Sequence, residues 1–219
     1  ADAWRELGDV DGEVISLLYA GNLHSFRHNG GPAALELAER AARVGAAAPR
    51  DEGLQWILRL HRAQALSLLG RHADADALLR PLLESAPAGS WRLFLAATVT
   101  ADDALVSGRP GDALPLYGVA AQLVARFGSP LGQLMQADTA AVALARLDRL
   151  QDAATTLAIC ELAHAELSWP ATGSAADGLA ETRQLVGDQR LAAGRERAAA
   201  LGVRAGLAWV GALARGEIG

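Results

Sequence analysis

Four segments of this sequence align with one another at a spacing of about 40 residues, and this internal repeat restricts the fold more than any other feature. Each segment begins with turn residues (Asn29-Gly30, Gly70, Gly108 and Asp148) and continues as a helix. An alanine recurs at the equivalent place in each segment, at Ala34, Ala75, Ala113 and Ala153. A repeated turn followed by a helix predicts a stack of helix pairs.

A second helix is expected before each of these turns. Helical stretches cover roughly residues 12–27, 52–69, 91–107 and 131–147. Small residues recur twelve positions before three of the alanines, at Ala63, Ala101 and Ala141, and Asn22 takes that place in the first unit. Two antiparallel helices approach closely only where small side chains face each other, so these positions are expected to be pair contacts.

The linkers between the units carry residues that end helices. They contain Ala48-Pro49-Arg50, Pro87 with Gly89, and Ser129-Pro130, and proline fits the first turn of a helix while stopping the one before it. Ala and Leu dominate the apolar residues, while only 5% of the chain is aromatic, which favours helix over strand. The sequence therefore predicts an all-α fold: a single domain over 1–219, with units at about 10–48, 51–87, 90–128, 130–168 and a degenerate one at 175–215. The alternative is an irregular helical bundle with accidental spacing.

The turn followed by a helix with an alanine about five residues on resembles the tetratricopeptide repeat, although the period here is longer than its usual length of about 34 residues. The openings Glu6-Leu7-Gly8-Asp9 and Gly12-Glu13 look like the LGD-x-x-G-E junctions of large bacterial signal-transduction ATPase regulators. The tail at 179–214, with its Leu-Gly breaks and Ala-rich end, is similar to the end of such proteins.

The resemblance implies a right-handed α-solenoid of about five antiparallel helix pairs. It also implies a non-catalytic sensor or protein-interaction region from a larger regulator that carries an ATPase and a LuxR-type DNA-binding or nucleotide-cyclase domain. All 20 basic residues are Arg, so a P-loop lysine or a Schiff-base lysine is excluded from this chain.

Charge and cysteine content restrict the partners. A formal net charge of -5 with dispersed Arg argues against direct nucleic-acid contact. Cys160 is the one cysteine, which excludes an internal disulfide and favours a reducing compartment. No apolar run reaches the length of about 18 residues that a membrane span needs, and no signal peptide is recognisable. We expect a cytoplasmic protein without membrane contact.

Few residues suggest chemistry. His24 and His28 have a metal-ligand spacing, but no third ligand follows nearby, so no metal or other cofactor is predicted. Cys160 is expected to be a buried, inert thiol. Asp102 and Asp103 lie inside a strongly apolar helix, and neighbouring residues on a helix point about 100° apart. Only one of the two should therefore face inward, and we expect it to be Asp102.

In tetratricopeptide arrays the first helix of each pair lines the concave face. Carried onto this chain, that arrangement places on one surface a tentative ligand-binding set: Tyr19, Gln64, Thr98, Asp102, Asp138 and Arg146. Such a surface suits a peptide, a partner domain or a small inducer. Two alternatives remain: these helices pack against the next turn of the superhelix, or the chain is a helical-array enzyme using Asp102 and Asp138. The apolar residues of 201–213 are expected to pack back onto the fourth pair or to form a homodimer through an end of the array.

Overall fold

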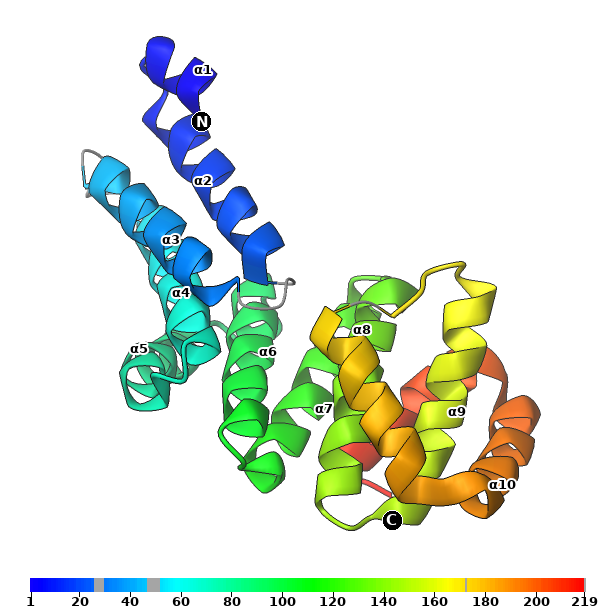
Figure 1. Ribbon diagram of the computed structural model, residues 1–219. Helices are drawn as coiled ribbons and strands as arrows, with labels where there is room; N and C mark the ends of the chain where they lie inside the picture. The colour runs from blue at the N-terminus through cyan, green and yellow to red at the C-terminus, as the bar shows by residue number, and fades with distance from the viewer. Residues whose placement is uncertain (26–29, 47–51, 172, 219) are drawn as a thin grey trace. The chain divides into compact units, whose positions relative to one another are not determined.

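The computed structural model describes residues 1–25, 30–46, 52–171 and 173–218, and its regular secondary structure is entirely α-helical over these ranges (Figure 1). The helices are α1 (Asp2–Glu6), α2 (Val10–Ser25), α3 (Gly31–Gly45), α4 (Glu52–Leu68), α5 (His72–Ser85), α6 (Trp91–Val106), α7 (Pro110–Arg126), α8 (Pro130–Arg146), α9 (Leu150–Glu166) and α10 (Gly173–Ala214). The predicted all-α class is confirmed.

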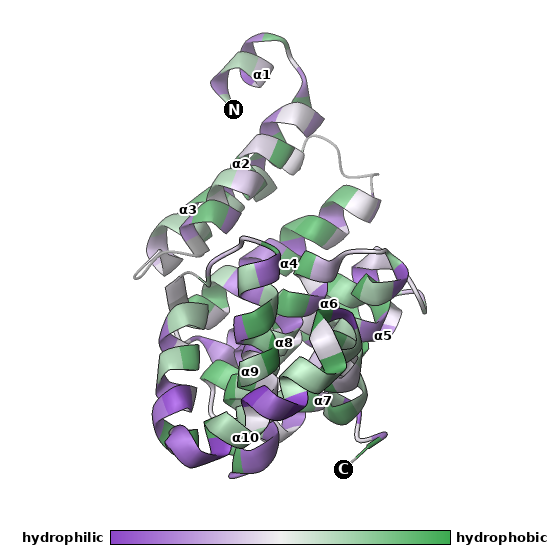
Figure 2. Ribbon diagram, turned by 90° about the vertical axis from the view of Figure 1, so that its right-hand side faces the viewer, coloured by the Kyte–Doolittle hydropathy of each residue, from purple (hydrophilic) through white to green (hydrophobic). Residues whose placement is uncertain are grey.

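The helices group into two compact units. The first, Ala1–Ser85, contains α1 to α5, and the second, Ala86–Gly219, contains α6 to α10. In the first unit, α2, α3 and α4 enclose a small core of Val14, Leu17, Leu18, Ala41, Leu54 and Leu58. The second unit has a larger core, and hydrophobic residues predominate along α6, α8 and α9 (Figure 2). One continuous domain over 1–219 stays a prediction.

The turn residues of the predicted repeat lie just after the ends of helices, as expected. Gly70, Gly108 and Asp148 follow α4, α6 and α8 and adopt positive φ angles of 72°, 80° and 58°. This left-handed conformation suits Gly, and Asp tolerates it better than most residues. Asn29 and the linker residues Ala48, Pro49 and Arg50 lie outside the described residues.

The small residues of the repeat lie at buried helix contacts, as predicted. The alanines of both series are at most 3% exposed: Ala34, Ala75, Ala113 and Ala153, and Ala63, Ala101 and Ala141. The helix pairs α2–α3, α4–α5, α6–α7 and α8–α9 are in contact. Side chains of this size let the paired helices approach closely.

The last helix, α10, folds back onto the preceding helices of the second unit. Gly187 and Gly202 adopt non-helical conformations with φ of 71° and 70°, which divide α10 into three straight helices at 173–186, 188–201 and 203–214. These segments pack against α7, α8 and α9 (Figure 1). Leu207, Val210 and Leu213 are buried there, which confirms that the chain end packs back onto the fourth pair. Association into a homodimer stays a prediction.

Replacing Ala113 by Leu tests the pair contact. Ala113 has no exposed surface, so the added carbons would overpack the α6–α7 interface and reduce the free energy of unfolding by about 1–3 kcal/mol. Ala125→Leu is the matched control, since Ala125 is exposed on the same helix. Urea denaturation of both variants measures the difference, and an unchanged Ala113→Leu midpoint would contradict the assigned contact.

Gly194 provides a sharper test of how closely α10 approaches α9. A Cβ atom at Gly194 would lie 2.6 Å from the carbonyl oxygen of Ala154, inside the contact distance that backbone atoms allow. Gly194→Ala should therefore destabilise the protein by roughly 1–3 kcal/mol, although alanine favours helix. At Gly111 on α7 the nearest atom to a new Cβ is 3.9 Å away, so Gly111→Ala should not destabilise. Equal thermal stability of the two variants would disprove the close approach.

Candidate functional site

The residues of the predicted ligand-binding set belong to different units. Tyr19 on α2 and Gln64 on α4 are in the first unit, where the Tyr19 side chain is exposed and Gln64 is half-buried. The other members, Thr98, Asp102, Asp138 and Arg146, are in the second unit. That all six share one surface stays a prediction.

Within the second unit, α6 and α8 present a shared polar surface. Thr98 on α6 donates a hydrogen bond of 3.4 Å to Oε1 of Gln136 on α8. Arg146, near the other end of the two helices, donates from Nη1 to the carbonyl oxygen of Leu105 at 3.1 Å. Thr139 on α8 is half-buried between these two links. We call Thr98, Asp102, Thr139 and Arg146 the α6–α8 face.

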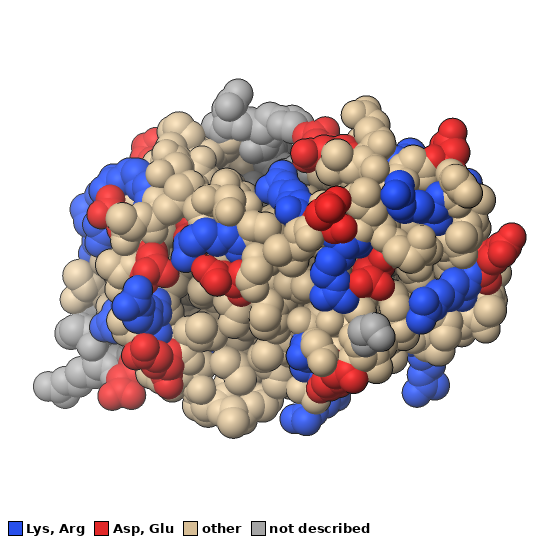
Figure 3. Space-filling model, turned by 90° about the horizontal axis from the view of Figure 1, so that it is seen from below, with Lys and Arg blue, Asp and Glu red and all other residues tan. Residues whose placement is uncertain are grey.

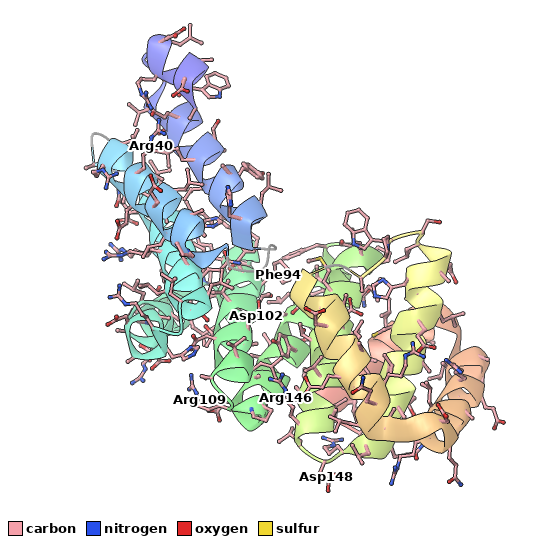
Figure 4. All side chains as sticks on the ribbon, in the orientation of Figure 1. Arg40, Phe94, Asp102, Arg109, Arg146 and Asp148 are labelled. Atoms are coloured by element: carbon pink, nitrogen blue, oxygen red, sulfur yellow. The ribbon has the colours of Figure 1, made fainter. Side chains whose placement is uncertain are left out.

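Asp102 lies on this face and is held from the neighbouring helix. Figure 4 shows it on α6, with Arg146 reaching toward the lower end of that helix. The Tyr117 hydroxyl on α7 donates a 2.8 Å hydrogen bond to Oδ1 of Asp102. Tyr117 is fully buried, whereas Asp102 keeps part of its surface in contact with solvent. A buried donor thus fixes one oxygen of a partly open carboxylate.

The prediction that Asp102 is the inward-facing member of the acidic pair is wrong. Asp103 is only 1% exposed, and its carboxylate forms an ion pair of 3.2 Å with Arg109, just beyond the helix end. The rotation of α6 about its axis decides which of two adjacent residues is buried, and the sequence of α6 alone does not fix that rotation. Asp103 has the structural role, and Asp102 remains on the α6–α8 face.

The surroundings of Asp102 change its acidity. Burial of the carboxyl group raises the pKa of Asp102 to about 6, and the hydrogen bond from Tyr117 opposes that shift. Burial, together with the Asp102 charge, raises the pKa of Tyr117 well above its usual value, while Thr139 and Arg146 act in the opposite direction. Asp102 therefore titrates close to neutral pH, where small changes in its surroundings alter its charge.

Asp138 does not lie open on the α6–α8 face. It is 4% exposed, and its Oδ1 lies 3.0 Å from Nε2 of His164 on α9. The second ring nitrogen of His164, Nδ1, lies 2.5 Å from the carbonyl oxygen of Trp169. A carbonyl only accepts, so Nδ1 carries a proton. His164 thus links the carboxyl group of Asp138 to the backbone carbonyl of Trp169.

Cys160 completes a Cys–Asp–His cluster that the sequence did not reveal, because Asp138 lies on α8 and the other two residues lie on α9. Its thiol interacts with Asp138, and burial, followed by the Asp138 charge, raises the pKa of Cys160 well above the usual value. Cys160 has no exposed surface. A nucleophilic cysteine needs a stabilised thiolate and access to substrate, so this cluster fits a packed, hydrogen-bonded core.

Other candidates offer no site. His61 lies beside a narrow hollow lined by Leu18, Gly21, Ala34 and Ala38, which has no room for a water molecule, and burial lowers the pKa of His61. The described residues contain no group of three His, Cys, Asp or Glu side chains that could hold a metal ion. His28, which has a metal-ligand spacing from His24 in the sequence, lies outside the described residues.

The molecular surface and the comparisons add little about partners. On the face seen in Figure 3, Arg side chains and carboxylates alternate without forming a patch of one sign. Among the described helices, none combines the length and apolar character of a membrane span. Comparison with protein-family models, with curated proteins and with solved structures gives no match.

The raised pKa of Asp102 predicts a specific pH dependence of stability. A carboxyl that ionises less readily in the folded state stabilises it at low pH, and this contribution is lost as the pH rises from about 4 toward 6. Asp102→Asn keeps an acceptor for Tyr117 and removes the charge. We expect this variant to exceed the wild type in stability at pH 7.5 by about 1–3 kcal/mol, and by much less at pH 4.

Asp112→Asn is the matched control for that experiment. Asp112 is an exposed carboxylate on α7, and its replacement removes the same formal charge from the same unit. Thermal denaturation of both variants at a series of pH values measures the effect. A destabilised Asp102→Asn protein at pH 7.5 would contradict the environment described for Asp102.

Proposed function

We propose that this chain is a non-catalytic regulatory sensor or protein-interaction domain that binds a peptide, a partner domain or a small inducer. It would belong to a bacterial transcriptional regulator or signalling ATPase and act in the cytoplasm. The proposal includes its architecture, a right-handed α-solenoid of about five tetratricopeptide-like helix pairs, in which the first helices of successive pairs line one concave face.

The observation that carries the proposal is the α6–α8 face. Its side chains come from the first helices of two successive pairs, and they keep surface in contact with solvent. They combine hydroxyl groups, a carboxylate and a guanidinium with neighbouring apolar side chains such as Met135, which is 43% exposed. A few oriented polar groups beside apolar surface are typical of a site that recognises a ligand.

The arrangement of the acids supports binding over catalysis. The enzyme hypothesis requires Asp102 and Asp138 to act on one substrate. Asp102 is hydrogen-bonded to Tyr117 on α7, whereas Asp138 is buried against His164 on α9. The two carboxylates are thus engaged with different helices, and His164 is turned toward Asp138 and a backbone carbonyl. General acid–base catalysis needs its groups within hydrogen-bond reach of one substrate position.

A blocking substitution tests the proposal. Peptides and cell metabolites are first screened for compounds that raise the melting temperature of the chain, because a ligand specific for the folded state stabilises it. Titration calorimetry then compares the wild type with Thr139→Trp, which places a bulky ring on the α6–α8 face. We expect the Kd of a ligand bound there to rise by at least about tenfold, equivalent to about 1.4 kcal/mol.

The matched control is Gln122→Trp, at an exposed position of α7, which should leave the Kd unchanged. Met135→Trp replaces Thr139→Trp if the latter does not fold, since Met135 lies one helical turn earlier on α8. A ligand that binds all the tryptophan variants as tightly as the wild type would exclude the α6–α8 face. Turnover of a screened compound would favour the enzyme alternative.

A further inference from the structure

Asp102 differs from the other carboxylates that the protein shields from solvent. Every other described carboxylate that is not exposed has an Arg or His within 4.0 Å: Glu13 with Arg5, Asp76 with Arg80, Asp103 with Arg109, Asp138 with His164, Asp152 with Arg149, and Glu161 with Arg183 and Arg195. Asp102 has no such cation among the described residues, and its one hydrogen bond is from a neutral hydroxyl.

Arg146, the cation closest in position on the α6–α8 face, already has other hydrogen-bond partners. Arg146 is the cation of the α6–α8 face, but its Nη1 donates to Leu105 and its Nη2 to Glu181 of α10, at 3.1 Å and 3.4 Å. It therefore joins α8 to α6 and α10, and Asp102 has no counter-ion among the residues that the structure describes. Its charge acts on Tyr117, the residue that holds Asp102.

An unpaired carboxylate at this position is costly to the fold. Withdrawal from water disfavours the charged form, as the raised pKa of Asp102 shows. Asn would accept the same bond from Tyr117 without a charge, and Leu or Ala would suit the surrounding apolar run. Residues that lower the free energy of unfolding and have no structural role are typical of functional positions.

The geometry around Asp102 favours an incoming cation. Tyr117 occupies Oδ1, and no donor among the described side chains bonds to Oδ2. Thr98 lies one turn earlier on α6 and Phe94 two turns earlier (Figure 4). Phe94 is half-buried and packs edge-on against Phe127, with ring centroids 6.5 Å apart. This side of α6 thus offers an apolar surface leading to a single carboxylate.

We propose that Asp102 binds the cationic group of a ligand, a guanidinium or an alkylammonium, whose alkyl stem lies along Thr98 toward Phe94. This inference rests on the function proposed for the α6–α8 face and names the chemistry that the face recognises. Either an Arg or Lys side chain of a peptide or a free amine inducer supplies such a group. The ligand provides the charge partner that every other shielded carboxylate obtains from the chain itself.

Butylguanidinium and its neutral isostere butylurea test the proposal directly. Their binding is followed at pH 7.5 by NMR of ¹³C-labelled Asp carboxyl groups. We expect butylguanidinium to bind at least about tenfold more tightly than butylurea and to lower the pKa of Asp102. Because that pKa is about 6 in the free protein, affinity should fall about tenfold for each pH unit below it. The pKa of Tyr117, which faces Asp102 from α7, is raised well above its usual value and so lies far from that range.

Two variants separate the Asp102 site from general electrostatic attraction. Asp102→Asn should bind both compounds equally, while Asp112→Asn should keep the preference for the cation. Equal binding of the two compounds by the wild type, or an unchanged Asp102 resonance at concentrations of about tens of millimolar, overturns the proposal. Retention of the preference in Asp102→Asn also overturns it.

A third probe identifies the source of the cation. N-acetylarginine N-methylamide carries the same guanidinium on a peptide backbone. Tighter binding than butylguanidinium supports a peptide ligand, and equal binding supports a free amine, both through Asp102. If a ligand from the screen is blocked by Thr139→Trp but binds Asp102→Asn normally, the cation assignment is wrong and the function of the face is retained. If no ligand from the screen binds more weakly to the tryptophan variants of the α6–α8 face, the proposed function is wrong, whatever these three probes show.

Discussion

The close contact between small side chains of paired helices is the constraint on which the structure depends. Alanine at the recurring positions lets the helices approach, and glycine takes the approach further where α10 meets α9. Dispersion attraction and apolar burial then act over the whole length of the helices, although each side chain is small. A core built from Ala and Leu has few bulky side chains that could fill the gaps between misaligned helices. The paired helices must therefore pack in one register.

That register also determines where polar groups can lie. A helix surrounded by neighbours has few positions at which a charge can reach solvent or a partner. The second unit satisfies this restriction in three ways: Asp103 is paired at a helix end, Asp138 is hydrogen-bonded to the half-buried imidazole of His164, and Asp102 remains partly open with a hydroxyl donor. The first two arrangements join elements of the fold. Only the third leaves bonding capacity directed outward.

Turn chemistry and alanine spacing made much of the fold predictable from sequence. A residue that must adopt positive φ and a small residue that must fit a contact are local requirements, so they leave local signals. The contacts of Asp102 with Tyr117 and of His164 with Asp138 left none. They depend on how each helix is rotated and how far it slides along its neighbour, which the packing of several helices decides together.

The place of α10 in the chain, after the helices that it covers, affects how the second unit reaches its folded state. The segments of α10 are synthesised after α7, α8 and α9, which they cover, and Arg215 bonds to the carbonyl oxygen of Gly118, 97 positions earlier. Helices α2 to α4 can bury their core against one another as they emerge from the ribosome, since their contacts are local. The apolar surface of the second unit stays uncovered until its final helices arrive. During synthesis, this half of the molecule is the one exposed to aggregation and to chaperones.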